Sequence, residues 1–292
     1  MSLIILLVVN WLATAGCYTL LATGFSLLFG VARVANFAHT ALYMLTGFLI
    51  YTFTSILGYG LILSVLLAIS SVIIVAISYY ILVLNRIKEQ PLAVMMVTFA
   101  LALLIQDILL YIFHASLRGI EPFVQGYLEI SGVRVSYQHI FTIIVSGVIL
   151  FGLIALLAKT KLGKAIRAVA QDTEMATVMG INVGHILLIT TSISAMLAGI
   201  AAAVILPLFS IEPYMWLNPL TIIIGAVVLG GLGSIKGSIF GALILSFAEV
   251  LVVTFIPEGG FLRGVASMLA MVAVLIFKPE GLFGVIFEEE RL

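Results

Sequence analysis

Two acidic residues inside apolar segments are the first candidates for chemistry in this chain. Asp107 lies in the run LIQDILLYIF, and Glu249 lies in LSFAEVLVV. A charge inside a membrane span is costly, so each such residue is a functional candidate by default. Neither acid has a basic partner in its own run, which favours paired or interface-level structural groups over a proton relay. His39, in VANFAHTALYM, is interpreted as a helix-end histidine, with a gating role as the alternative.

The remaining polar residues do not form a catalytic pattern. The four histidines, at positions 39, 114, 139 and 185, are scattered without the spacing of metal ligands. The sequence contains no glycine-rich loop that ends in Gly-Lys-Ser or Gly-Lys-Thr, so it offers no phosphate-binding loop for ATP hydrolysis. We therefore predict that the chain is not an enzyme, has no catalytic or metal site and binds no cofactor of its own.

The composition places these residues in a membrane protein. Of the 292 residues, 63% are apolar and 9% are charged, and the mean hydropathy is +1.32. Globular domains are roughly 45–50% apolar and about 25% charged. So little charge excludes a soluble enzyme, a disordered protein and a nucleic-acid binder. We predict an all-α polytopic membrane protein, with one transmembrane domain over residues 1–292 and a lipid bilayer as its surroundings.

Apolar runs of membrane-spanning length predict eight to nine transmembrane helices. They cover residues 3–30, 37–57, 61–84, 92–113, 140–158, 186–208 and 262–277. Residues 220–255 form a glycine-rich apolar stretch that crosses twice or forms a re-entrant pair. Between the fourth and fifth spans, ISGVRVSY alternates as a short strand does.

The positions of Lys and Arg predict the orientation. Basic residues of short loops stay on the cytoplasmic side. With nine crossings, Arg33, Arg86, Lys159, Lys236 and Lys278 all fall on one side. This places the N-terminus outside the cell and the C-terminus in the cytoplasm.

Closely spaced glycines mark the stretch LGGLGSIKGSIFGA. Gly233, Gly237 and Gly241 repeat every four residues, which on a helix makes a smooth strip for tight packing. The alternative is a broken helix beside a cavity, and the pair Gly230-Gly231 supports a break. On that alternative, Gly230, Gly231 and Gly233 are candidates to line a substrate pathway.

A basic loop at residues 159–185 is the strongest feature of the sequence. Its apolar positions predict a short amphipathic helix over residues 162–179 that stops at Gly180. A second helix could begin at Asp172 or Thr173, with Thr173 as its cap. The apolar face would be buried on the membrane surface or in a groove of a soluble partner. Asp172 and Glu174 argue against binding to lipid alone.

Three segments of the chain carry a family resemblance. EMATVMG (residues 174–180) resembles the Glu-Ala-Ala-x-x-x-Gly core that permeases of ATP-binding-cassette importers present to their ATPases, with Met175 in place of the middle alanine and without the proline-containing tail. LGKAIRAVAQDTEMATVMGINV, FGVARVANFAHTALYML and KPEGLFG resemble segments of the branched-chain amino-acid permease family. Thr40 and Ala41 stand where that family usually has a glycine and an acid. The resemblance covers residues 15–285.

This resemblance implies a subunit of a heteromeric importer in a prokaryotic cytoplasmic (inner) membrane. Its partners would be a second permease, two cytoplasmic ATPases that bind the ATP, and an extracytoplasmic substrate-binding protein. The 159–185 loop would carry the coupling helix. The expected ATPase-coupling residues are Arg167, Asp172, Glu174, Ala176 and Gly180, and the expected pathway residues are Asn36, Phe37 and His39 together with the three glycines above.

Two alternatives stay open at this point. An ion-coupled secondary transporter would use Asp107, Glu249 and the break at residues 230–241. Permeases of similar sequence also carry urea or short amides, so branched-chain or other hydrophobic amino acids are the first expectation for the substrate and urea or short amides the second.

Overall fold

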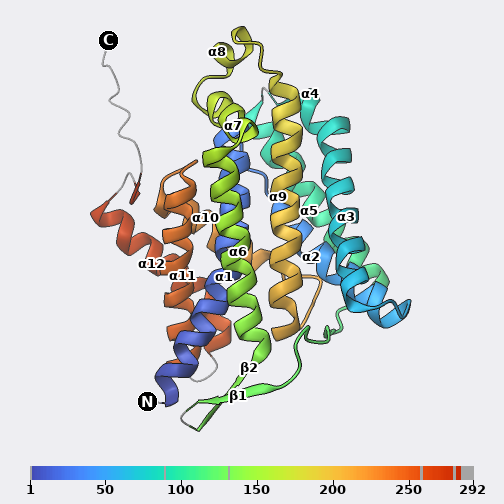
Figure 1. Cartoon of the computed structure of the whole chain (residues 1–292), viewed down its shortest axis with the longest axis vertical. Coiled ribbons are helices and arrows are strands. Elements are labelled where there is room, and N and C mark those ends of the chain that lie inside the picture. Colours follow the sequence, from blue (N-terminus) through green and yellow to red (C-terminus); the bar gives the residue numbers. More distant parts are fainter. Residues whose placement is uncertain (1, 89, 131, 257–258, 279–280, 284–292) are drawn as a thin grey trace.

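The structure is a computed structural model that describes residues 2–283, except for 89, 131, 257, 258, 279 and 280. It is a bundle of helices arranged around α1 (Ser2–Ala32), which packs against α6, α9, α10 and α11 (Figure 1). The predicted all-α polytopic membrane fold is confirmed. Small side chains explain the close packing of α1 and α9, because Ala195, Ala198, Ala201 and Ala202 are buried and let the two backbones approach.

Within the described residues, six helices are long and apolar enough to cross a membrane. They are α1, α3 with its extension through α4 (Leu61–Ile87), α5 (Pro91–Phe113), α6 (Tyr137–Lys159), α9 with its extension to Leu208 (Val183–Leu208) and α11 (Ile235–Phe255). Three shorter helices join them, namely α2 (Ala38–Tyr51), α10 (Leu217–Gly230) and α12 (Arg263–Phe277). Together they correspond to the eight to nine helices predicted.

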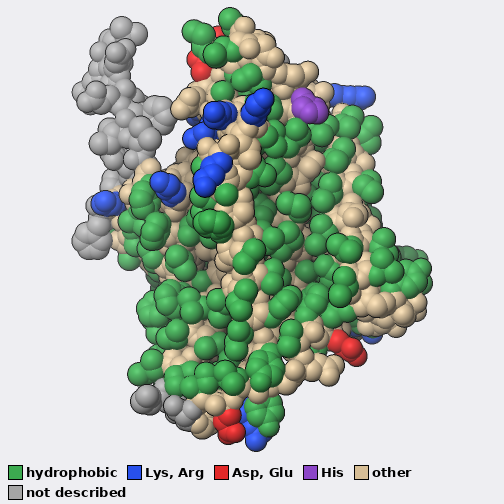
Figure 2. Space-filling view, viewed as in Figure 1, with side chains coloured by type: hydrophobic (Ala, Val, Ile, Leu, Met, Phe, Trp, Pro, Cys, Tyr) green, Lys and Arg blue, Asp and Glu red, His purple; other side chains and the backbone are tan. Residues whose placement is uncertain are grey.

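The bundle has two distinct ends. One end carries α7 (Lys161–Gln171) and α8 (Thr173–Val178), and Lys and Arg side chains gather around it (Figure 2); we call it the basic end. The opposite end carries a hairpin of β1 (Tyr127–Ile130) and β2 (Val133–Ser136), antiparallel with Glu129 opposite Arg134. We call it the hairpin end. The alternation in ISGVRVSY therefore predicted a real strand, β2.

The glycine-rich stretch consists of two antiparallel helices joined by a tight turn. A side chain at Gly237 would collide with the Gly230 carbonyl, and one at Gly241 with the Ala226 carbonyl, so both glycines serve close packing of α10 on α11. Gly233 does not belong to this helical strip. It lies in the turn with φ +80°, and Gly231 has φ +96°. The prediction that Gly233, Gly237 and Gly241 form one strip on a helix is therefore wrong for Gly233 and holds for the other two.

Two spans begin only after a non-helical segment. The segment of residues 33–37 precedes α2, which runs from the basic end toward the hairpin end, and the segment of residues 209–216 precedes α10, which runs the other way. We call these segments the α2 lead-in and the α10 lead-in. Non-helical backbone at membrane depth is tolerated only where it is buried in protein or lines a cavity, so both lead-ins are candidates for function.

Candidate functional site

The first half of the basic loop packs on the bundle itself. The Thr160 hydroxyl caps α7 by accepting a hydrogen bond from the Gly163 amide at 2.9 Å. Ile166 and Val169 on α7 are buried, and α7 contacts α1, α6 and α9. Neither of the two burial places expected from the sequence, the membrane surface or a partner groove, is therefore used by α7. Arg167 lies on its exposed side.

The second half of the loop, α8, projects beyond the bundle (Figure 1). The predicted single helix over 162–179 is broken at Asp172, whose carboxylate accepts a hydrogen bond from the Met175 amide at 2.9 Å and so caps α8. The prediction that Thr173 is the cap is wrong. Its hydroxyl donates instead to the Val169 carbonyl. The helix ends before Gly180, which has φ +81°.

Apolar side chains cover the exposed surface of α8. Met175 is 63% exposed, Val178 83% and Met179 79%. Ala176 is the one buried residue of α8, and Glu174 is exposed beside it. The structure thus brings the five predicted coupling residues together in α7, α8 and the turn that follows. A short, firmly capped helix with an apolar exposed face is suited to binding a protein partner.

One contact connects this loop to the α2 lead-in. The Arg33 guanidinium donates a hydrogen bond from Nη2 to the Ala170 carbonyl near the C-terminus of α7, at 2.7 Å. A cation at that position also interacts favourably with the helix dipole. Arg33 has φ +56°, a left-handed conformation that few residues other than glycine adopt. This hydrogen bond joins the C-terminal end of α7 to the start of the lead-in.

Asn36 organises the rest of the α2 lead-in. Its side-chain oxygen accepts a hydrogen bond from the amide of Ala38, the first residue of α2, at 3.1 Å, and its amide nitrogen donates to the Tyr79 hydroxyl at 2.5 Å. The Phe37 amide donates to the Thr98 hydroxyl of α5 at 3.2 Å. These bonds satisfy the backbone where the helix is absent and hold the start of α2 against the middle of α5.

The α10 lead-in reaches the same part of α5 from the other end. Trp216, at the start of α10, is fully buried, and its indole N–H donates to the Gln106 side-chain oxygen at 2.7 Å. The rings of Phe37 and Trp216 both pack against Phe99 of α5, with centroid distances of 6.3 and 5.9 Å. The N-termini of two oppositely directed helices therefore converge beside Phe99.

The outer face of α5 at this depth is partly uncovered. Phe99, Leu103 and Asp107 are exposed and, at spacings of four residues, share one face of the helix. Asp107 lies six residues before the end of α5 at Phe113. A carboxylate inside a spanning helix is costly when it faces lipid, so this face is a candidate for contact with protein or water.

His39, by contrast, lies in the interior between three helices. Its Nε2 donates to the Leu21 carbonyl of α1 at 3.0 Å, and its Nδ1 is 3.1 Å from the Ser194 hydroxyl of α9. Because the carbonyl can only accept, Nε2 carries the proton and Nδ1 accepts from Ser194. The ring also fills the space left by Gly24. The structure thus separates His39 from Phe37, and a role in the pathway stays a prediction.

The three predicted pathway glycines lie at the basic end, away from Phe99. Gly230 ends α10, and its carbonyl accepts a hydrogen bond from the Phe283 amide at 3.1 Å. The Leu282 amide donates to the Leu229 carbonyl at 2.7 Å, so this part of the KPEGLFG segment caps α10. Positions 279, 280 and 284 of that segment lie outside the described residues. Whether the glycines line a pathway likewise stays a prediction.

A cavity of about 400 Å³ opens at the basic end beside the α2 lead-in. Arg33, Val34 and Asn36 form one wall, Tyr80 and Lys88 another, and Thr191 of α9 a third. Thr173 of α8 also lines it. The cavity therefore connects the 159–185 loop with the buried Asn36 before α2.

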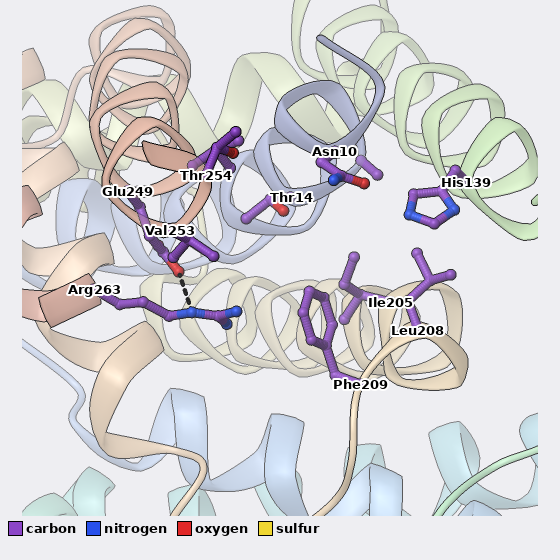
Figure 3. Close-up of a pocket in the computed structure, with 12 residues that line it drawn as sticks. Asn10, Thr14, His139, Ile205, Leu208, Phe209, Glu249, Val253, Thr254 and Arg263 are labelled. Atoms are coloured by element: carbon purple, nitrogen blue, oxygen red, sulfur yellow. Dashed lines mark ion pairs between the residues drawn. The ribbon is translucent and has the colours of Figure 1, made fainter. Parts of the chain in front are cut away.

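At the hairpin end, a cavity of about 210 Å³ contains an ion pair (Figure 3). Arg263 Nε of α12 lies 3.7 Å from Glu249 Oε1 of α11, and the Tyr18 hydroxyl donates to the same oxygen at 3.3 Å. The Arg263 guanidinium lies over the ring of Phe209, which belongs to the α10 lead-in. Glu249, a lone acid in the sequence, is thus paired with a residue from the next helix.

Sequence reasoning missed the residues that build the centre of the site. Phe99, Gln106 and Trp216 lie in ordinary apolar or loop segments, and only the neighbouring Asp107 stood out. Arg263 was overlooked although it is the second residue of the span predicted over residues 262–277. The available signal was Arg263 itself, the single basic residue next to the last apolar run on its hairpin side.

Comparison with known proteins decides the family. The family model described as "Branched-chain amino acid transport system / permease component" matches residues 7–277. The chain belongs to this permease family. It is 27% identical to the high-affinity branched-chain amino acid transport system permease protein BraD of Pseudomonas aeruginosa and 26% identical to LivH of Escherichia coli K12, with 94% of each chain covered in both cases. The predicted family is confirmed.

A solved structure supports the fold of this permease. PsaBC from Streptococcus pneumoniae in complex with Fab aligns with a TM-score of 0.52 and 14% sequence identity, over 93% of this chain and 91% of that one. At this identity the likeness concerns the fold alone. The permease therefore shares its helical architecture with a solved chain.

Proposed function

We propose that this permease is one membrane subunit of an ATP-driven, binding-protein-dependent importer for branched-chain amino acids. It works with a second permease, two cytoplasmic ATPases and an extracytoplasmic binding protein. The observation that carries the proposal is α8, a capped helix that projects from the bundle with Met175, Val178 and Met179 exposed. Exposed apolar side chains of this kind supply the desolvated centre of a protein interface.

The contact between Arg33 and Ala170 supports a coupling role for this loop. ATP binding would bring the ATPases together and move α8, and with it α7. The hydrogen bond from Arg33 then shifts the α2 lead-in, which sets the position of Phe37 and the start of α2. Coupling requires only that the ATPases contact α8 differently in their two states.

The uncovered face of α5 supports the place of the pathway and of the second permease. Phe99, Leu103 and Asp107 would face the partner permease or the substrate path between the two chains. The converging N-termini of α2 and α10 add a positive potential at this depth, which suits the carboxylate of an amino acid. Trp216 and Phe37 supply apolar walls for its side chain.

The substrate class rests on the relatives and on the chemistry of these walls. The curated relatives are named as branched-chain amino acid permeases. We assign the basic end to the cytoplasm of a prokaryotic inner membrane, because Lys and Arg gather there. The N-terminus then lies outside and the C-terminal part of α12 near the cytoplasm.

The experiment that tests the proposal measures ATPase association and uptake of leucine in proteoliposomes. Glu174→Arg and Gly180→Arg alter α8 without touching the bundle, and both should abolish ATPase association and ATP-driven uptake. Leu128→Glu at the hairpin end is the matched control and should leave ATPase association unchanged. Uptake that survives both α8 variants, or that stops when the ion gradient collapses at constant ATP, contradicts the proposal.

A further inference from the structure

The cavity around Glu249 and Arg263 holds more buried polar atoms than the described protein satisfies. Glu249 is 2% exposed, yet its Oε2 has no hydrogen-bond partner among the described residues. The same holds, within the described part of the chain, for Arg263 Nε and for His139 Nδ1 across the cavity. Buried groups of this kind are normally satisfied. Three of them around one cavity indicate that something polar occupies it.

The cavity contains one group of each charge that a zwitterion needs as partners. Glu249 Oε2 is free to accept from an ammonium group, while Tyr18 and Arg263 hold the other oxygen. The Arg263 guanidinium extends from the ion pair into the cavity toward Ile205 and Phe209 (Figure 3). Its planar fork is suited to a carboxylate. One negative and one positive group therefore face the same space.

Apolar and polar side chains share the other walls. Ile205, Leu208, Phe209, Val250 and Val253 line the cavity together with Asn10, Thr14 and Thr254. A volume of about 210 Å³ holds about seven waters at ~30 Å³ each, which is comparable with one small amino acid. A second cavity of about 200 Å³ shares Thr14, Ile205, Phe209 and Arg263 with it and reaches the α10 lead-in. The apolar part of the wall, around Phe209, gives an aliphatic side chain a place beside the charge pair.

We propose that this cavity binds a free aliphatic α-amino acid, with Glu249 holding its ammonium group, Arg263 its carboxylate and the wall around Phe209 its side chain. The site lies at the hairpin end, within a single permease chain and apart from the α5 face. It rests on the proposed function in that the amino acid is the transported class. A bound amino acid would touch Phe209 and so contact the α10 lead-in.

The test uses the complete complex of both permeases and the ATPases in nanodiscs, without the binding protein. Binding of tritiated L-leucine is measured with competition by 4-methylpentanoate, which lacks the ammonium, and 3-methylbutylamine, which lacks the carboxylate. Both analogues should bind at least about tenfold more weakly than leucine, since each leaves one buried charge unpaired.

Two variants assign the charges separately. Glu249→Gln, which keeps a hydrogen-bonding side chain for Tyr18, should weaken leucine at least about tenfold and leave 4-methylpentanoate unchanged. Arg263→Gln should weaken leucine equally and leave 3-methylbutylamine unchanged. Glu129→Gln and Arg134→Gln, an exposed cross-strand pair at the same end, are the matched controls and should bind all three ligands as the parent does.

The outcomes separate this site from the proposed function. Three results would overturn the proposed amino-acid site. They are unchanged leucine binding in both cavity variants, no leucine binding by the parent complex, and equal losses for all three ligands in each variant. ATP-driven leucine uptake with the binding protein is measured on the same preparation. If uptake fails while binding follows the expected pattern, the proposed function is wrong and the amino-acid site stands. If uptake occurs without the expected binding pattern, the proposed function stands and the amino-acid site is wrong.

Discussion

The two short spans, α2 and α10, each begin with a ring packed on Phe99 but are approached from opposite ends of the bundle. The α2 lead-in lines the cavity at the basic end and is held to α7 through Arg33. The α10 lead-in lines the cavities at the hairpin end and is held by backbone pairing of Ile211 with Arg118. Each lead-in therefore has access to a different side of the membrane.

Because the two lead-ins reach opposite ends of the bundle, each could respond to a different partner protein. Of the two lead-ins, within the described residues, the α2 lead-in is the one with a hydrogen bond to the 159–185 loop, so on the proposed function it is placed to respond to the ATPases. The α10 lead-in borders the Glu249–Arg263 ion pair through Phe209 and is placed to sense the substrate side. Because both helices start against Phe99, a shift of either changes the same centre.

The largest expected effect comes from removing the apolar surface of α8. The pair Val178→Glu and Met179→Glu should weaken ATPase binding at least about thirtyfold, corresponding to about 2 kcal/mol at an interface centre. Titration of purified ATPase against the permease pair in detergent measures it. Leu128→Glu at the hairpin end should leave the affinity unchanged. If the parent and the α8 variant bind the ATPase with equal affinity, α8 at the basic end is not the ATPase-binding surface.

Asn36→Ala should give the next largest effect, because it removes both the bond from the Ala38 amide and the bond to Tyr79. In a membrane protein two such bonds are worth about 1–3 kcal/mol together. Tyr79→Phe removes only one of them and should cost about half as much. Denaturant unfolding monitored by circular dichroism measures both variants. Equal losses in the two would mean that the bond from the Ala38 amide contributes nothing.

Arg33→Ala sharpens the comparison between the lead-ins directly. Losing the bond to Ala170 should lower the ratio of leucine uptake to ATP hydrolysis about fivefold, which is the lower end of typical coupling factors. Binding of the ATPase should be unchanged. Arg118→Ala at the α10 lead-in should leave this ratio near the parent value. A ratio that falls equally in both variants would show that the coupling loop does not act through α2 alone.

Trp216→Phe should have the smallest effect of the series. It keeps the ring contact with Phe99 and removes the 2.7 Å bond to Gln106, at a cost of about 0.6–1.7 kcal/mol. Gln106→Leu in the same background removes the orphaned amide and should recover part of the loss. Unfolding midpoints of the two variants give the comparison. No recovery in the double variant would place the loss in packing rather than in the hydrogen bond.

Much of the fold could be predicted from the sequence because apolar length and turn chemistry are local properties. The span predicted over residues 92–113 is α5, and Gly180 ends α8 with the positive φ expected of a helix stop. The break at Asp172 could be placed to within one residue. Its cap was misassigned, since Asp172 and Thr173 are both good caps and only the backbone decides between them.

The candidate site was harder to predict because it depends on contacts between distant segments. Asn36 and Phe37 were expected from the resemblance, but their partners Tyr79 and Thr98 carry no signal of their own. The span predicted over residues 37–57 is α2 followed directly by a π-helix over Thr52–Ile56, but an apolar run does not reveal this change of helix type. Glu249 looked unpaired because Arg263 lies in the next helix.

The most direct test of the account is the proximity of α8 to an ATPase. A single cysteine at Val178, in a chain whose native Cys17 is buried and is replaced by serine, is cross-linked in the intact complex with and without ATP. The account predicts a cross-link to the ATPase that changes in yield with ATP, and none from a cysteine at Leu128. A cross-link from Leu128 but not from Val178, or none from either, would contradict it.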